Sequence, residues 1–182
     1  MEAAAAFLAV RPRSISETGR RLRHLSYPPP LVERVVERLI EMGYLDDEAF
    51  ARAWVASRDR ARPRGETVLR RELRLKGIER DVVVAVLGER AAAAETAEDA
   101  TGAGPPADAV GADRAAAERL LARRRSALMR EPDLRKRRQR AYALLARNGF
   151  DPDVCRDAIA TLDPAAVSLD LLDARGEDEA VD

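Results

Sequence analysis

The chain of 182 residues is long enough for one ordinary domain or for several small modules. Its 32 basic and 32 acidic residues cancel, so no net charge draws the chain as a whole to nucleic acid. The single cysteine, Cys155, excludes an intrachain disulfide, and no apolar run reaches the roughly 18 residues of a membrane span.

Apolar residues recur at intervals of three and four along nearly the whole chain, which is the spacing of amphipathic helices. Val32, Val35, Val36 and Leu39 form one such set. Alternating runs typical of strands are absent from the sequence, so we predict an all-α fold. The expected helices cover residues 3–11, 15–25, 30–42, 47–61, 66–76, 80–90, 113–129, 133–147 and 152–161.

Several residues mark the ends of these helices. The sequence SISE, from Ser14 to Glu17, is a capping box, in which both side chains satisfy free backbone N–H groups. Gly77 and Gly149 follow two predicted helices, where glycine commonly adopts a left-handed conformation. Ser26 occupies the same place in an earlier segment, where a residue with a side chain fits this conformation less well.

Three segments of the chain are similar to one another. The segment around Leu22 matches the one around Leu73 at an offset of 51 residues, and this matches the one around Leu145 at an offset of 72. The aligned apolar positions include Leu22, Leu73 and Leu145; Tyr27, Ile78 and Phe150; and Leu31, Val82 and Val154. The larger offset indicates an insertion between the second and third segments.

This similarity predicts three tandem three-helix repeats. They cover residues 1–45, 46–90 and 113–163. Residues 91–112, rich in Ala, Gly, Pro and acids, are expected to form a flexible insert, and residues 164–182 an acidic C-terminal tail.

An acidic triplet, Asp46, Asp47 and Glu48, lies between two predicted helices. Such a triplet could bind a metal ion, act as a general acid and base, or cap a helix. Adjacent side chains at one helix start do not converge on one point, whereas capping needs only free N–H groups and the helix dipole. We therefore interpret this stretch as a structural joint between repeats, formed by Asp46, Asp47, Phe50 and Trp54, with Tyr44 and Leu45 as further core residues.

Motifs of catalysis and of metal or cofactor binding are missing from the sequence. One histidine, His24, and one cysteine cannot make a Cys/His metal set, and no GxxxxGK[ST] loop is present. Catalysis through His24 would require a positioned partner and a pocket, yet its predicted helix is polar. We therefore predict no enzymatic activity, no cofactor and no metal site.

Basic residues are concentrated in two segments. Ala51 to Lys76 contains nine basic and three acidic residues, and Asp113 to Arg147 contains twelve and four. A basic helical run is often only a solvated face, but two such segments suggest surfaces for nucleic acid or an acidic protein groove. The first candidate contact patch comprises Arg58, Arg60, Arg62, Arg64, Arg70, Arg71 and Arg74. The second comprises Arg135, Lys136, Arg137 and Arg138.

The sequence resembles the RecX family of regulators of the RecA recombinase. The middle repeat carries the resemblance most strongly, in GYLDDEAFARAWVASRDRARPRGETVLRRELRLKGI. The first repeat agrees in LAVRPRSISETGRRL and the third in DLRKRRQRAYALLARNGFDPDVCRDAI. The resemblance spans residues 4–163, while SYPPP in the first repeat departs from the usual Gly-aromatic helix end.

The resemblance implies an elongated, curved, modular protein of three-helix repeats without catalytic activity. It implies binding in the groove of the RecA filament on single-stranded DNA. It also implies inhibition of RecA ATP hydrolysis, strand exchange and filament growth, in DNA repair, homologous recombination and the SOS response. From the sequence as a whole we expect a cytoplasmic monomer with no secretory signal and no membrane partner.

Two other classes of function are also considered. The chain could bind single- or double-stranded DNA directly through helix-turn-helix-like basic units, or it could be a small enzyme. Direct binding to DNA would weaken steeply as salt rises, because phosphate contacts release counterions.

Overall fold

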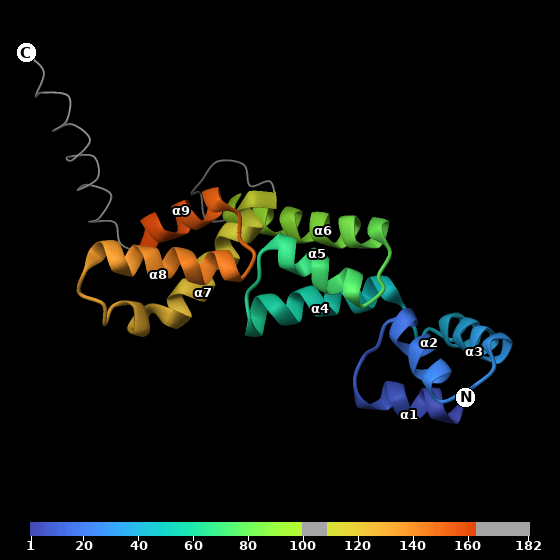
Figure 1. The fold of residues 1–182 in the computed structure, drawn as a ribbon. Helices are drawn as coiled ribbons and strands as arrows, with labels where there is room; N and C mark the ends of the chain where they lie inside the picture. Colours follow the sequence, from blue (N-terminus) through green and yellow to red (C-terminus); the bar gives the residue numbers. More distant parts are fainter. Residues whose placement is uncertain (100–108, 163–182) are drawn as a thin grey trace, which may run out of the picture. The chain divides into compact units, whose positions relative to one another are not determined.

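The computed structural model describes the backbone of residues 1–99 and 109–162 (Figure 1). All regular structure in these ranges is α-helical, which confirms the predicted all-α fold. The helices are α1 (Glu2–Val10), α2 (Ile15–His24), α3 (Pro29–Glu41), α4 (Asp47–Ala61), α5 (Glu66–Leu75), α6 (Arg80–Asp99), α7 (Ala109–Leu128), α8 (Leu134–Arg147) and α9 (Pro152–Leu162). None of the helices within the described ranges is both long and apolar enough to cross a membrane.

The chain divides into two compact units. The first contains Met1–Arg60 and Leu69–Glu89, and the second contains Ala61–Val68 together with the chain from Arg90 onward. Helices α4, α5 and α6 therefore each contribute residues to both units.

The first unit holds two clusters of buried apolar residues. One joins α1, α2 and α3 around Leu22, Val32 and Leu39. The other joins α4, α5 and α6 around Leu69 and Leu73, whose side chains are fully buried. Each cluster forms because apolar residues at helical spacing face the same side of their helix.

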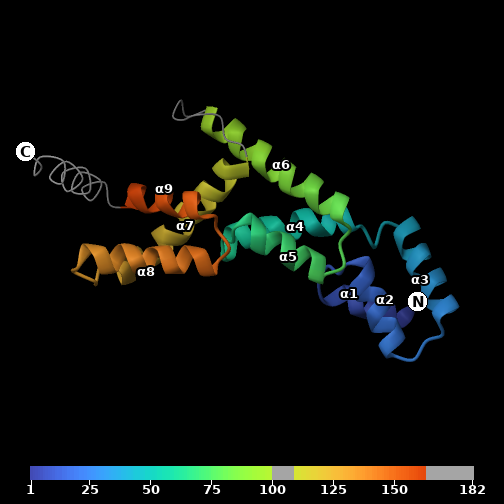
Figure 2. The same ribbon diagram turned by 45° about the horizontal axis from the view of Figure 1, so that its top comes forward.

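The second unit has one core, built by α7, α8 and α9, which Figure 2 shows packed together. Leu121, Leu145 and Val154 are its largest fully buried side chains. Cys155 is also buried there, and burial raises the pKa of its thiol. Cys155 therefore serves as a small apolar core residue.

The loop that follows the middle helix of each repeat contains a residue with positive φ. Gly77 and Gly149 have φ of 81° and 84°, as expected for glycine after a helix. Ser26 has φ of 63° and is the one non-glycine residue in this region within the described chain. The next residue also differs, since Tyr27 is 41% exposed whereas Ile78 and Phe150 are 4% and 5% exposed.

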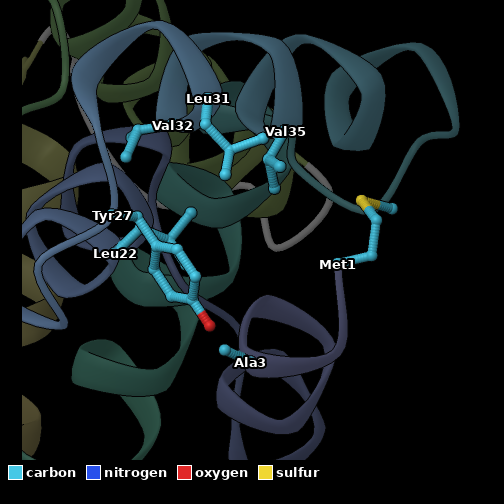
Figure 3. A pocket seen from close by; sticks show the side chains of 7 residues that line it. All are labelled: Met1, Ala3, Leu22, Tyr27, Leu31, Val32 and Val35. Atoms are coloured by element: carbon cyan, nitrogen blue, oxygen red, sulfur yellow. The ribbon is translucent and has the colours of Figure 1, made fainter.

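The end of α2 therefore packs differently from the ends of α5 and α8. Figure 3 shows a small apolar hollow that the first repeat leaves between α1 and α3. Its lining consists of Met1, Ala3, Leu22, Tyr27, Leu31, Val32 and Val35. The SYPPP departure from the family pattern therefore coincides with a change in packing.

Two details of the sequence prediction differ from the structure. Helix α6 continues to Asp99 and α7 begins at Ala109, so both helices enter the segment expected to be a flexible insert. The alanine-rich run after Arg90 favours helix, and this propensity outweighed the compositional signal for a linker. Residues 100–108 of that segment, and the predicted acidic tail at 164–182, lie outside the described residues.

Tyr44 was predicted as core and is 63% exposed, so that prediction is wrong. Gly43 has φ of 72°, and the turn it makes directs the next buried side chain to Leu45 instead. Leu45 is 2% exposed and packs with the core of the first repeat.

Candidate interaction surfaces and the joints between repeats

Each residue of the acidic triplet has a different role. Asp46 accepts a hydrogen bond from Ala49 N at 2.9 Å and so caps its own helix, α4. Asp47 accepts one from Ile15 N at 2.9 Å and so caps α2, a helix of the preceding repeat. Glu48 pairs with Arg52 one turn along α4 at 3.0 Å. No metal-binding group of His, Cys, Asp and Glu occurs among the described residues, these three included.

The bond from Asp47 belongs to a wider set of contacts, here called the first joint. Ser14 Oγ donates to Lys76 O at 2.6 Å, and Lys76 Nζ binds Glu17 Oε1 at 2.8 Å. Gly77 packs directly against Ser16, so any side chain at position 77 would overlap it. The end of α5 is therefore fastened to the start of α2.

The two carboxylates of the first joint respond to burial in different ways. Burial raises the pKa of Asp47, and the hydrogen bond from Ile15 N acts in the opposite direction. Burial also acts to raise the pKa of Glu17, but hydrogen bonds from Lys76, Arg11 and the backbone of Ser14 hold it at about 2. Glu17 is therefore ionised at neutral pH and binds two cations.

A second joint repeats the same pattern between α5 and the later helices. Gly65 N donates to Asn148 O at 3.0 Å, as Ser14 binds Lys76 O in the first joint. Glu66 N donates to Asp113 Oδ2 at 2.9 Å, as Ile15 N binds Asp47. Gly149 packs against Val68, which is one position after the residue that corresponds to Ser16, the contact of Gly77.

The correspondence follows the sequence offsets of the repeats. Ser14 and Ile15 match Gly65 and Glu66 at 51 residues, and Lys76 matches Asn148 at 72. The joint is thus part of the repeating unit, and the starts of α2 and α5 each receive the end of the next middle helix.

The second joint also contains a buried ion pair that the sequence analysis missed. Arg90 Nη1 lies 2.7 Å from Asp113 Oδ1, with the two side chains only 9% and 8% exposed. Burial raises the pKa of Asp113, while Arg90 and Glu66 N lower it. A sequence signal for this joint did exist, because Arg-Pro-Arg precedes both Ser14 and Gly65.

Trp54, a predicted member of the structural joint, is half-buried among charged groups. The Arg58 guanidinium lies 4.3 Å and Lys76 Nζ 4.8 Å from the centroid of its ring, within cation–π range. Trp54 Nε1 donates to Glu72 Oε2 at 2.8 Å, and Arg58 Nε binds the same oxygen at 2.7 Å. Phe50 is buried and stacks on the indole, with ring centroids 5.9 Å apart.

The first candidate contact patch does not lie in one compact unit. Arg62 and Arg64 belong to the second unit, and the other five arginines to the first. Arg58 is engaged by Glu72, and Arg64 donates to Asn148 Oδ1 in the second joint. The arginines of this patch with exposed side chains are Arg60, Arg62, Arg71 and Arg74, while Arg70 is half-buried.

The second candidate contact patch lies on one helix, α8, but its members face different ways. Arg135 and Lys136 are exposed, whereas Arg137 and Arg138 are half-buried. Lys136 borders an open hollow of about 430 Å³, which among the described residues is also lined by Gln139, Arg140 and Ala143. The sequence analysis missed these three residues, although their spacing from Lys136 places them on one helical face.

Comparisons of sequence and of fold both find similarity to RecX proteins. Residues 46–87 match the second three-helix domain of RecX, and residues 112–159 match the third. A regulatory protein RecX from Mycobacterium sp. (strain JLS) is 35% identical over 156 residues, which cover 84% of this chain and 75% of that protein. The one from Mycobacterium tuberculosis (strain ATCC 25177 / H37Ra) is 32% identical over 162 residues, covering 85% and 81%.

Two solved structures have a similar fold. RecX from Lactobacillus salivarius superposes with a TM-score of 0.67 at 18% identity, over 89% of this chain and 93% of the other. A second regulatory protein RecX gives 0.65 at 20% identity, over 86% and 71%. The sequence relatives, supported by the shared fold, show that this chain belongs to the RecX family of regulatory proteins.

Proposed function

We propose that this chain regulates the RecA recombinase by binding its filament on single-stranded DNA in the cytoplasm. In this proposal the chain acts by binding, as a monomer and without catalysis of its own. It lowers RecA ATP hydrolysis, strand exchange and filament growth during DNA repair, homologous recombination and the SOS response. Membership of a family of regulatory proteins is the observation that carries the proposal.

The repeated joints support a binding role. Two joints of the same design fasten the start of one middle helix to the end of the next. A protein built in this modular way, in the proposed repeats 1–45, 46–90 and 113–163, can place several small surfaces on a repeating target. Each added contact then forms at high effective concentration, so weak contacts suffice.

The test is the rate of RecA ATP hydrolysis on single-stranded DNA. Addition of this protein in less than equimolar amount is expected to lower the rate, since one bound molecule would affect several RecA protomers. A RecA-independent ATPase serves as the control. An unchanged rate at equimolar protein would contradict the proposal.

Direct DNA binding is the second candidate function, favoured by the exposed Lys136 beside the α8 hollow. It predicts tight binding to bare DNA, with a log–log salt slope of about 0.9 per phosphate neutralised on duplex and about 0.7 on single strands. Tight binding with this salt dependence, and no effect on the RecA ATPase, would favour this function instead.

A further inference from the structure

The hollow on α8 occupies the place that the joints occupy on the two earlier middle helices. With the repeat offsets of 51 and 72, Ser16 on α2 corresponds to Thr67 on α5 and to Gln139 on α8. Glu17 corresponds in the same way to Val68 and Arg140. Gln139 and Arg140 are two of the four residues in the described part of the chain that line the hollow.

On α2 and α5 this face is covered by the end of the next middle helix. Gly77 packs on Ser16, Lys76 binds Glu17, and Gly149 packs on Val68. Within the described part of the chain, α8 is the last middle helix, and the face that carries Gln139 is open. The same kind of surface therefore occurs three times and is covered by a helix end twice.

The charge on the α8 face is opposite to that on α2. In the first joint Glu17 binds an incoming cation, Lys76, at 2.8 Å. At the corresponding place α8 carries Arg140, and Lys136 lies one turn before it. A helix end that docks here must bring an acidic side chain where Lys76 brings a basic one.

One local difference determines which groups would bind the carboxylate. Helix α8 begins at Leu134, about one turn earlier than the alignment with α2 and α5 would place it. Its own Asp133 accepts a hydrogen bond from Lys136 N at 3.0 Å and so occupies the cap position. An incoming carboxylate would therefore meet the side chains of Lys136 and Arg140. Arg140 already pairs with Glu131 at 2.8 Å, and Lys136 Nζ lies 3.9 Å from Asp133 Oδ2.

We propose that this face of α8, lined by Lys136, Gln139, Arg140 and Ala143, docks an acidic helix end of the protein partner. The helix end would pack on this face as one does on α2 and α5, but its carboxylate would bind the side chains of Lys136 and Arg140 and not a free backbone N–H. This inference rests on the proposed function, because the partner is the RecA filament. The two covered copies of the surface both receive protein, which favours a protein over nucleic acid as the occupant.

A second copy of this chain fits the surface poorly. The corresponding helix end that the first repeat offers is the end of α2, with Ser26 at the glycine position. That end carries Arg21 and Arg23 in its last turn and no acidic residue. Docking it on α8 would place like charges together.

The experiment measures affinity for RecA filaments assembled on oligo-dT with a non-hydrolysable ATP analogue, and separately for oligo-dT alone. Two variants alter the face, Lys136→Glu with Arg140→Glu to reverse its charge, and Ala143→Trp to fill the hollow. The matched control is Arg124→Glu with Arg130→Glu, two exposed arginines of the same unit. Far-UV circular dichroism checks that each variant keeps its helical content.

Both variants of the face are expected to bind filaments at least about tenfold more weakly than the control, as for loss of a desolvated charge pair. Their affinity for oligo-dT alone should match that of the control. Filament affinity equal to the control would overturn the inference, and so would a parallel loss of oligo-dT binding, which would identify nucleic acid as the occupant. If the unaltered protein fails to bind filaments, the proposed function itself is wrong and the inference falls with it.

Discussion

The two joints share a capping carboxylate and a glycine contact, but their side-chain chemistry differs. In the first, a half-buried Asp47 caps α2, and ionised Glu17 binds Lys76 and Arg11 near the surface. In the second, Asp113 caps α5 and forms a buried pair with Arg90. Since the same contacts form around a surface ion network and a buried pair, the helix caps and glycine contacts define the joint. The charged partners determine how much stability each joint loses when its capping carboxylate is removed.

Removal of the capping carboxylate should affect the second joint far more than the first. Asp113→Ala is expected to lower the free energy of unfolding by about 3–5 kcal/mol, because it removes the partner of a buried cation. Asp47→Ala should cost about 1 kcal/mol, the typical value of a lost cap. Urea unfolding followed by circular dichroism measures both.

Asp113→Asn is the conservative control for that comparison, because it keeps the shape of the side chain and can still accept from Glu66 N. Its free energy of unfolding should lie between those of the unaltered protein and Asp113→Ala. Equal losses for Asp47→Ala and Asp113→Ala would contradict a special role of the buried pair.

Substitution of Ser14 and Gly65, which directly precede α2 and α5, should show how the two joints differ in packing. Gly65→Ser is expected to destabilise the protein by about 1–3 kcal/mol, because any Cβ at position 65 would overlap the backbone of Gly149. Ser14→Gly should cost only about 1 kcal/mol, since it removes a cap and its bond to Lys76 O. Thermal unfolding of the two variants measures the difference, and a stable Gly65→Ser protein would show that the second joint can open to admit a side chain.

Acid should weaken the first joint through Glu17. The pKa of Glu17 is lowered from 4.5 to about 2, so its contribution is present above pH 4.5 and is lost as pH falls through 2. Trp54 is the only tryptophan in the sequence and contacts Lys76, so its fluorescence reports unfolding close to this joint. Stability measured this way should fall as pH drops from about 4.5 to about 2.

Glu17→Gln tests the cause of that acid sensitivity. The variant should be less stable at neutral pH and should depend less on pH in the same range. If its pH dependence matched that of the unaltered protein, another group would be responsible. Asp113 acts in the opposite sense, because its raised pKa gives a contribution present below pH 3.8 and lost as pH rises through the folded value.

Much of the fold could be predicted from local signals. The capping box at Ser14, the glycines at 77 and 149 and the apolar spacing placed most helix ends within a few residues. The exceptions have local causes of their own. The alanine-rich run extended α6, and the turn at Gly43 placed Tyr44 outside the core.

The candidate contact patches were harder to predict from local sequence signals. The sequence does not distinguish one basic residue from another. In the structure Arg58 is half-buried and pairs with Glu72 at 2.7 Å, whereas Lys136 is exposed beside a hollow and lies 3.9 Å from Asp133. Whether an arginine is engaged depends on carboxylates far away in the chain. Local charge therefore predicts a basic segment more reliably than a binding surface.

The sequence by itself determined the all-α class, the repeat offsets and the family, because these depend on short-range periodicity and on matched positions. Only the tertiary structure decided what the acids do. Asp47 caps α2 at Ile15, 32 residues earlier in the chain, and Asp113 caps α5 at Glu66, 47 residues earlier. Such bonds depend on how helices pack, since a free N–H at a helix start can be satisfied by any carboxylate that the fold brings near.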